Sequence, residues 1–559
     1  MKIQLKLLSS LAKVLPHADP VEDAYEGKLS GFLNETLSFQ AAWKNTDPAC
    51  VDVWSERTAN VTLTVDSPLG DAVHVRQVKL IPVRFTTFPD ADDNYLSKEP
   101  GMFPDILSEP EKVWRCFNTH WECAWIDIEP KADAKPGVYP ITITITPVNG
   151  GESVSRTQLV EILPAMLPEQ ELILTHWFHN DCLCHYYGVE MFSDEFFRIA
   201  ENFLALAVKR GMNMVLTPIH TPPLDTAVGG ERMTAQLVDI TVENGEFTFG
   251  FEKLEKWVAM CKRAGIKYYE IAHLFTQWGA KYAPKIMATV DGEYKQLYGW
   301  ETSGTGEEYT GFLRKYVPAV LAKMKELGVD KQCWFHISDE PAVEMLEDYK
   351  AAKAAVADIL EGYNIMDALS SFEFYASGAL TKPIPANNHI APFIEHGVKG
   401  LWTYYCIGQY KDVSNMFVSM PSARNRILGV QLYKYDIEGF LQWGFNFWYS
   451  QLSVYPIDPF RVSDSGYAFP SGDGYVVYPG ANGEPLISLR LKAFNEAISD
   501  LRALRLLESL IGREKVLKML EKGLDKPLTF SEYPRSEEWL YHKREEINRA
   551  IRRALKAKA

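Results

Sequence analysis

The chain has 559 residues, of which 47% are hydrophobic and 23% charged, with 36 glycines and 32 prolines. This ordinary globular composition excludes a disordered, collagen-like or low-complexity protein, and the length suffices for several domains of about 150 residues each. The formal net charge of -15 argues against nucleic acid and anionic membranes as partners. Eight cysteines are too few for a dense disulfide framework. No continuous signal-peptide core or membrane span is seen, so we expect a soluble, cytoplasmic protein.

Residues 1–165 contain short runs of β-type sequence. In the run that starts at Tyr139, isoleucine alternates with threonine, which is the period-two pattern of a half-buried antiparallel strand. Similar runs lie near Leu37 and Val61. These runs predict an N-terminal β-sandwich domain. A proline-containing segment, residues 163–171, is expected to link it to the rest of the chain.

From residue 172 onward, short apolar runs alternate with amphipathic helical stretches. This alternation predicts a (β/α)8 barrel of the TIM type over residues 172–510. The Asn244-Gly245 pair predicts an inserted β-hairpin after the second strand. Residues 511–559 are charged and are expected to form a C-terminal helical extension with a solvated basic end. The eight candidate barrel strands begin at Leu172, Met212, Tyr268, Cys333, Ala368, Gly400, Gly439 and Gly474.

The strongest candidate for chemistry is the segment WFHISDEP, because barrel enzymes place their active sites at the carboxyl ends of strands. Its strand ends in Asp339 and Glu340, directly before Pro341. Two adjacent carboxylates can divide acid and base roles, since proximity raises the pKa of one of them. Both reach one pocket only if the backbone leaves regular strand geometry there. The alternative is a helix N-terminus whose dipole the two acidic residues stabilise.

Five motifs in the same order carry a resemblance to a known family. They are SDEP, WTYYC, EGFLQWGFNFW, GDGYVVYPG and the helix ISLRLKAFNEAISDLR. In these motifs the sequence resembles glycoside hydrolase family 123 and its relatives over about residues 172–510. The preceding β-sandwich is also similar to the architecture of that family.

The resemblance implies an activity and a mechanism. Characterised members are retaining exo-β-N-acetylgalactosaminidases that use substrate-assisted catalysis. By resemblance, Glu340 is the general acid/base, and Asp339 holds the 2-acetamido group whose carbonyl oxygen attacks the anomeric carbon. Neighbouring carboxylates suit this mechanism, because it needs no enzyme nucleophile across the sugar. It needs no metal and no cofactor.

The resemblance implies an exo-acting β-N-acetylhexosaminidase that prefers N-acetylgalactosamine. The implied substrate is a small oligosaccharide or glycoside with a terminal 2-acetamido sugar. Tyr404 matches the family's tyrosine on the sixth strand and is expected to donate to the acetamido carbonyl. The histidines and cysteines between His176 and His185 do not have a standard zinc spacing. Further flat or polar groups near predicted strand ends are candidate sugar ligands: Trp402, Trp448, Tyr375, His179, Asp181, His273, Trp278 and Asp473.

Two other functions remain open. A hydrolase of sugars without an acetamido group would need a different second carboxylate, for which Glu270, Asp436 and Asp473 are candidates. A non-catalytic carbohydrate-binding protein on the same scaffold is the other alternative. The presence of both Asp339 and Glu340 argues against it.

Overall fold

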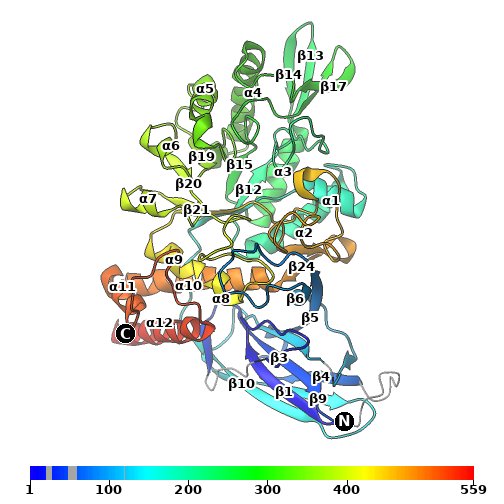
Figure 1. Ribbon diagram of the computed structural model, residues 1–559, viewed down its shortest axis with the longest axis vertical. Coiled ribbons are helices and arrows are strands. Elements are labelled where there is room, and N and C mark those ends of the chain that lie inside the picture. The colour runs from blue at the N-terminus through cyan, green and yellow to red at the C-terminus, as the bar shows by residue number, and fades with distance from the viewer. Residues whose placement is uncertain (21–27, 48–59, 119, 559) are drawn as a thin grey trace.

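The computed structural model describes residues 1–20, 28–47, 60–118 and 120–558. The molecule is elongated, with two N-terminal β-sheets at one end and a barrel at the other (Figure 1). Long helices from the C-terminal part of the chain lie between these two regions. Within the described residues, no helix is both long and apolar enough to cross a membrane.

The barrel is a parallel sheet of eight short strands. Sheet order is β20-β19-β18-β15-β12-β11-β22-β21, and a bridge between Ala386 and Tyr404 nearly closes it. The carboxyl ends of all eight strands therefore surround one opening. The strands are β11 (Ile173–His176), β12 (Met214–Thr217), β15 (Tyr268–Ile271), β18 (Cys333–Phe335), β19 (Asn364–Ala368), β20 (Lys382–Ile384), β21 (Trp402–Tyr404) and β22 (Gly439–Gln442).

The barrel strands differ from the prediction in three places. The run from Gly474 is not a barrel strand, because its core, Val477–Pro479, pairs in a different sheet. An apolar run reveals a strand but not its partner. The strand that replaces it, β20, has three residues including Pro383, so it lacks the usual strand pattern. The fifth strand ends at Ala368, where the predicted fifth strand begins. Tyr404 lies on the seventh barrel strand and not on the predicted sixth.

Helices cover the outside of the barrel. The first long one begins at Ser193, whose side chain accepts a hydrogen bond from the Phe196 backbone, as at a typical N-cap. The next ends at Gly265, whose φ of 97° suits glycine at a C-cap. These helices are α1 (Asn180–Tyr187), α2 (Asp194–Lys209), α3 (Glu252–Ala264), α4 (Glu307–Glu326), α5 (Leu346–Val356), α6 (Glu373–Ala376), α7 (Ala391–Glu395), α8 (Ser422–Arg426) and α9 (Leu428–Lys434).

The predicted hairpin insertion is confirmed. Strands β13 (Asp239–Glu243) and β14 (Glu246–Gly250) pair antiparallel across Asn244 and Gly245, which both have positive φ. They share a four-stranded sheet with β16 (Ile286–Val290) and β17 (Glu293–Tyr298). This sheet projects from the barrel in Figure 1.

The N-terminal region consists of two β-sheets that share an apolar core, which includes Trp43, Ile126 and Ile143. As the alternation predicts, the isoleucines of β9 are buried, while its threonines pair with hydroxyl groups of β10. The seven-stranded sheet runs β1 (Ile3–Ser9), β3 (Leu37–Asn45), β8 (Glu122–Ile128), β5 (Val73–Val83), β6 (Gly101–Ser108), β24 (Pro485–Ser488) and β23 (Val477–Pro479). The five-stranded sheet runs β2 (Leu29–Phe32), β10 (Val154–Leu163), β9 (Gly137–Pro147), β4 (Asn60–Asp66) and β7 (Trp114–Arg115).

A strand from the C-terminal part of the chain joins the N-terminal region. Strand β24 pairs with β6 of the N-terminal region and leads directly into α10 (Leu489–Ile511). Helix α10 contacts α8 and α9 of the barrel, and it is followed by α11 (Arg513–Glu521) and α12 (Glu537–Lys558). The N-terminal sheets are thus fastened to the barrel through a shared strand and helix.

A buried ion pair strengthens this junction. Arg490 donates two hydrogen bonds to Asp105, at 2.9 and 2.8 Å, and further ones to the Gly472 and Tyr475 carbonyls. Because both charges are fully buried, Asp105→Ala would leave the guanidinium uncompensated, and we expect it to lower the free energy of unfolding by about 3–5 kcal/mol. Asp71→Ala, which breaks an exposed pair with Lys131, should have little effect. Urea unfolding followed by circular dichroism measures both, and equal effects would contradict this account.

Candidate active site

A cavity of about 770 Å³, including its open mouth, lies at the carboxyl ends of the barrel strands. Loops from several strands contribute to it, including the loop around Asp225 after β12 and the loop around Leu452 after β22. The cavity therefore has the position at which barrel enzymes bind their substrates. Residues at or beyond the strand ends that line it are Trp177, Gln277, Asp339, Ala368, Tyr404 and Trp443.

Asp339 and Glu340 both line the cavity, as predicted. Strand β18 has already ended at Phe335, and Glu340 has a φ of 42°, so the backbone leaves strand geometry at this point. The Glu340 amide donates to the Ala368 carbonyl at 3.0 Å, which fixes the turn. The alternative of a helix N-terminus at this position does not hold, because the following helical segment, a 3-10 turn that leads into α5, begins only at Val343.

The two carboxyl groups differ in their surroundings. Burial, and then the charge of Glu340, raise the pKa of Asp339 well above its ordinary value, while the charge of His336 opposes this. The cavity walls also raise the pKa of Glu340, whereas Tyr404 lowers it by donating to Oε1 at 2.5 Å. Two neighbouring carboxyls with raised pKa values favour a pair that holds one proton.

Two tryptophans form part of the wall, and each is fixed by a buried carboxyl group behind it. Trp177 donates from Nε1 to Glu270 at 2.7 Å, and Trp443 donates to Asp473 at 2.8 Å. Asp473, a predicted sugar ligand, therefore lies behind the wall and does not line the cavity. Burial raises its pKa to about 8.

Trp402, Trp448 and Tyr375 do not line the cavity either. Trp402 shares the inward face of β21 with Tyr404 but lies deeper, where it packs on Trp334 with ring centroids 5.2 Å apart. Trp448 is buried beyond the end of β22, and its indole nitrogen donates to a backbone carbonyl. Tyr375 belongs to helix α6 instead of a strand end.

His179 and Asp181 form a buried cluster with Arg232. Arg232 donates to Asp181 at 2.6 Å and to Nδ1 of His179 at 2.9 Å, so Nε2 of His179 carries a hydrogen and donates to the Trp443 carbonyl. Both side chains are thus committed to Arg232 and lie outside the cavity lining. Their place is behind Trp443, which they help to position.

Several residues that line the cavity were absent from the candidate ligands, including Trp177, Asp225, Gln277 and Trp443. Asp225 has a φ of 41° and accepts a hydrogen bond from the Leu452 amide at 2.9 Å, and burial raises its pKa to about 6. Gln277 has a buried Oε1 with no hydrogen-bond donor among the described residues. Trp443 directly follows β22, and this position is the one sequence signal that could have identified it. Asp225 and Gln277 lie in loops without such a signal.

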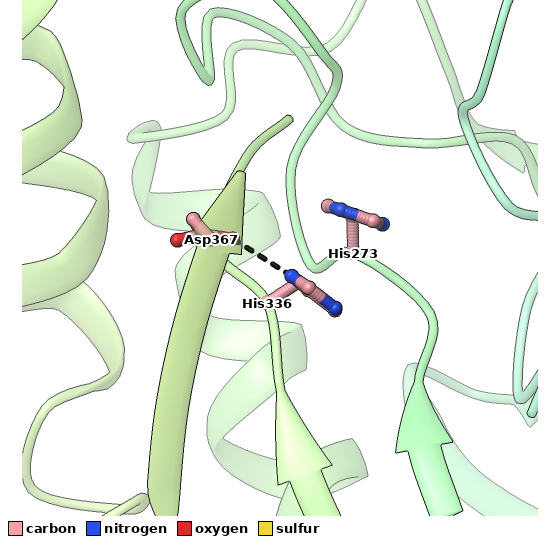
Figure 2. Close-up of side chains that lie close together, drawn as sticks. All are labelled: His273, His336 and Asp367. Carbon is pink, nitrogen blue, oxygen red and sulfur yellow. Dashed lines mark hydrogen bonds and ion pairs between the residues drawn. The ribbon is translucent and has the colours of Figure 1, made fainter. Parts of the chain in front are cut away.

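One group of side chains in the described part of the chain is close enough to share a metal ion: His273, His336 and Asp367 (Figure 2). The two imidazole rings stack with centroids 4.1 Å apart and planes inclined by 19°. Imidazole binds a metal in its ring plane, so two nearly parallel rings do not converge on one ion. Both nitrogens of His336 are moreover engaged by carboxylates. The geometry therefore does not fit a metal centre.

Comparisons with known proteins identify the family of the chain. The catalytic-domain model of glycoside hydrolase 123 matches residues 177–507. A family 123 glycoside hydrolase from Clostridium perfringens, studied for glycolipid glycan hydrolysis, superposes with a TM-score of 0.74 at 16% identity, covering 99% of this chain and 98% of that one. This likeness shows a shared fold.

Another solved structure is much less similar. A GH20 exo β-N-acetylglucosaminidase from Vibrio harveyi gives a TM-score of 0.30 at 9% identity, covering 95% of this chain and 100% of that one. No curated protein matches in sequence. The family match spans more than half of the chain and includes the whole barrel opening. The chain therefore belongs to glycoside hydrolase family 123 and is a glycoside hydrolase.

Proposed function

We propose that the protein is an exo-acting β-N-acetylhexosaminidase that prefers N-acetylgalactosamine and retains anomeric configuration by substrate assistance. The observation that carries this proposal is the adjacency of Asp339 and Glu340 in one cavity, held by the turn at Glu340. A 2-acetamido group supplies the nucleophile, so the second carboxylate need not lie across the sugar.

The two carboxyl groups have different roles in this mechanism. Glu340 protonates the leaving oxygen and then activates water. Asp339 accepts a hydrogen bond from the acetamido N–H and stabilises the positive charge that develops as the carbonyl oxygen attacks. Tyr404 orients Glu340 in the free cavity and can donate to the acetamido carbonyl when sugar is bound. Trp177 and Trp443 supply flat walls for the sugar.

The geometry weakens the rival hydrolase mechanism. Of its three candidate carboxylates, Glu270 is buried beneath Trp177, Asp473 lies behind Trp443, and Asp436 forms an exposed pair with Arg505. Asp225 is an additional cavity carboxylate, but we assign it to a sugar hydroxyl, since it also holds the Leu452 loop.

A panel of aryl β-glycosides that differ at C2 and C4 tests the proposal. We expect the highest kcat/KM with a 2-acetamido group and an axial 4-hydroxyl. A thiazoline analogue of the sugar should inhibit competitively, because it mimics the cyclised intermediate. Trapping a covalent glycosyl-enzyme on Asp225 would instead establish the rival mechanism. Sugar binding without any hydrolysis across the panel would favour a non-catalytic binding protein.

Trp278 is expected to contact the leaving group. It lines the cavity, is 41% exposed and has a φ of 59°, and its amide donates to the Asp339 carbonyl at 2.8 Å. The strained backbone holds an exposed ring at the cavity mouth. Such a ring suits stacking on the first sugar of the leaving group. Trp278→Ala should raise KM about tenfold for a disaccharide-linked N-acetylgalactosaminide and leave that of the methyl glycoside nearly unchanged.

Steady-state kinetics on both substrates measures this selectivity. Tyr294→Ala, which removes an exposed ring on strand β17, is the matched control and should change neither KM. An equal rise in KM for both substrates would assign Trp278 to the terminal sugar.

A further inference from the structure

The ring of His336 lies between two carboxylates beneath the cavity. Its Nδ1 is 3.0 Å from Asp367 Oδ1, and its Nε2 is 2.7 Å from Glu270 Oε1 (Figure 2 shows the contact with Asp367). All three side chains are fully buried. Trp177, whose indole donates to Glu270, separates this cluster from the cavity.

The other partners of the two carboxylates are all hydrogen-bond donors. Glu270 also accepts from Thr175 and Trp177. Asp367 also accepts from the Ile337 amide and from the Tyr349 hydroxyl, at 3.1 and 2.6 Å. Carboxylates surrounded by donors are ionised acceptors, so both nitrogens of His336 must donate to them. His336 is therefore an imidazolium.

The pKa of His336 agrees with this assignment. Burial alone would lower the pKa of His336, but the hydrogen bonds that His336 donates to Asp367 and Glu270 outweigh burial and raise this pKa to about 10. Burial, and then the charge of His336, lower the pKa of the stacked His273 well below its ordinary value. His273 is thus a neutral ring stacked on a cation, and neither of its nitrogens has a partner among the described residues.

The cluster is connected to the cavity carboxylates through the backbone and through charge. Asp367 fixes the segment between His336 and Asp339 by accepting from the Ile337 amide. Among the charged groups with the largest effects on the pKa of Asp339, Glu340, Asp367 and Glu270 raise it. His336 lowers it and so favours the ionised form. Glu340 is exposed at the cavity, where the surrounding walls raise its pKa and the hydrogen bond from Tyr404 lowers it. The positive charge of His336 therefore opposes protonation of Asp339.

We propose that His336 is a positioning residue whose fixed positive charge favours ionised Asp339 while Glu340 keeps the proton. Glu270 and Asp367 hold His336 in its charged form. This inference rests on the proposed function, because substrate assistance needs Asp339 ionised and Glu340 protonated. It predicts that substitutions in the cluster move the acidic limb of the pH–rate profile and leave the basic limb in place.

The charge of His336 can be measured without substrate. In the full-length protein labelled with ¹⁵N-histidine, the His336 signals, identified by their loss in His336→Gln, should show both nitrogens protonated up to about pH 9. A neutral His336 at pH 8 would overturn the proposal. This result is independent of whether the enzyme hydrolyses acetamido sugars, so it separates failure of this inference from failure of the proposed function.

The pH dependence of kcat/KM with 4-nitrophenyl β-N-acetylgalactosaminide tests the effect on Asp339. His336→Gln should move the acidic limb up by about one pH unit, because an attractive charge is lost. Glu270→Gln should move it down by a similar amount, because a repulsive charge is lost while Asp367 keeps His336 protonated. The basic limb should stay in place in both variants.

A purely structural role gives a different result. It would lower the rate in both variants without moving the acidic limb in opposite directions, and that outcome would overturn the proposal. Glu270→Gln is the milder change, since the Thr175 hydroxyl can reverse its hydrogen bond toward the new amide. If His336→Gln does not fold, Glu270→Gln alone tests the proposal. A downward shift of the acidic limb supports it, and an upward shift or no shift overturns it.

Discussion

Replacing Glu340 by Gln is expected to lower kcat about 1,000-fold on an aryl β-N-acetylgalactosaminide with a poor leaving group, such as phenyl. The amide keeps the shape of the side chain and can still accept from Tyr404, but it has no proton to give to the leaving oxygen. The loss should shrink with a dinitrophenyl leaving group, which departs without protonation. Steady-state rates on the two substrates measure this difference.

Glu344→Gln is the matched control for this substitution. Glu344 is an exposed glutamate four residues further along the chain, and it does not line the cavity. Its rates should equal those of the unaltered enzyme. Near wild-type turnover of the phenyl glycoside by Glu340→Gln would remove Glu340 from the acid role.

Replacing Asp339 by Asn is expected to lower kcat about 100- to 1,000-fold and to weaken binding of the thiazoline analogue by a similar factor. The charge that stabilises the cyclising acetamido group is lost in this variant. Glu340→Gln should bind the analogue nearly normally, because the analogue already lacks its leaving group. Isothermal titration of both variants with the thiazoline separates the two roles, and equal affinities would contradict them.

The same substitution should stabilise the fold. Because the folded-state pKa of Asp339 lies above its unfolded value, ionising this group costs stability as the pH rises above about 4. Asp339→Asn removes that cost, so its apparent melting temperature should exceed that of the unaltered protein by about 1–2 °C at pH 7. The difference should fade as the pH falls toward 4. A lower melting temperature at both pH values would show that Asn disrupts the site.

The residues that the sequence predicts best are those placed by local pattern. Asp339 and Glu340 follow an apolar strand and precede a proline, so their place at a barrel strand end is predictable. Tyr404 and Trp402 share one face of a strand, which the period of two predicts, but the depth of each ring in the barrel depends on the tilt of all eight strands. Only Tyr404 reaches the cavity.

Long-range contacts explain the remaining differences. His179 and Asp181 pair with Arg232, about 50 residues away, and nothing in the local sequence indicates that partner. The run near Gly474 does contain a strand, but that strand pairs with β24, which in turn joins the N-terminal sheet through β6. Such pairings arise from the packing of the whole chain, which sequence periodicity does not contain.

Substrate assistance itself is tested most directly by weakening the substrate's own nucleophile. The measurement is kcat/KM for 4-nitrophenyl β-N-acetylgalactosaminide and for its mono-, di- and trifluoroacetyl analogues, which have progressively less nucleophilic carbonyl oxygens. The account predicts that the rate falls steeply along this series, by about tenfold or more for each fluorine if the carbonyl attacks in the transition state. A rate that stays flat across the series would contradict it.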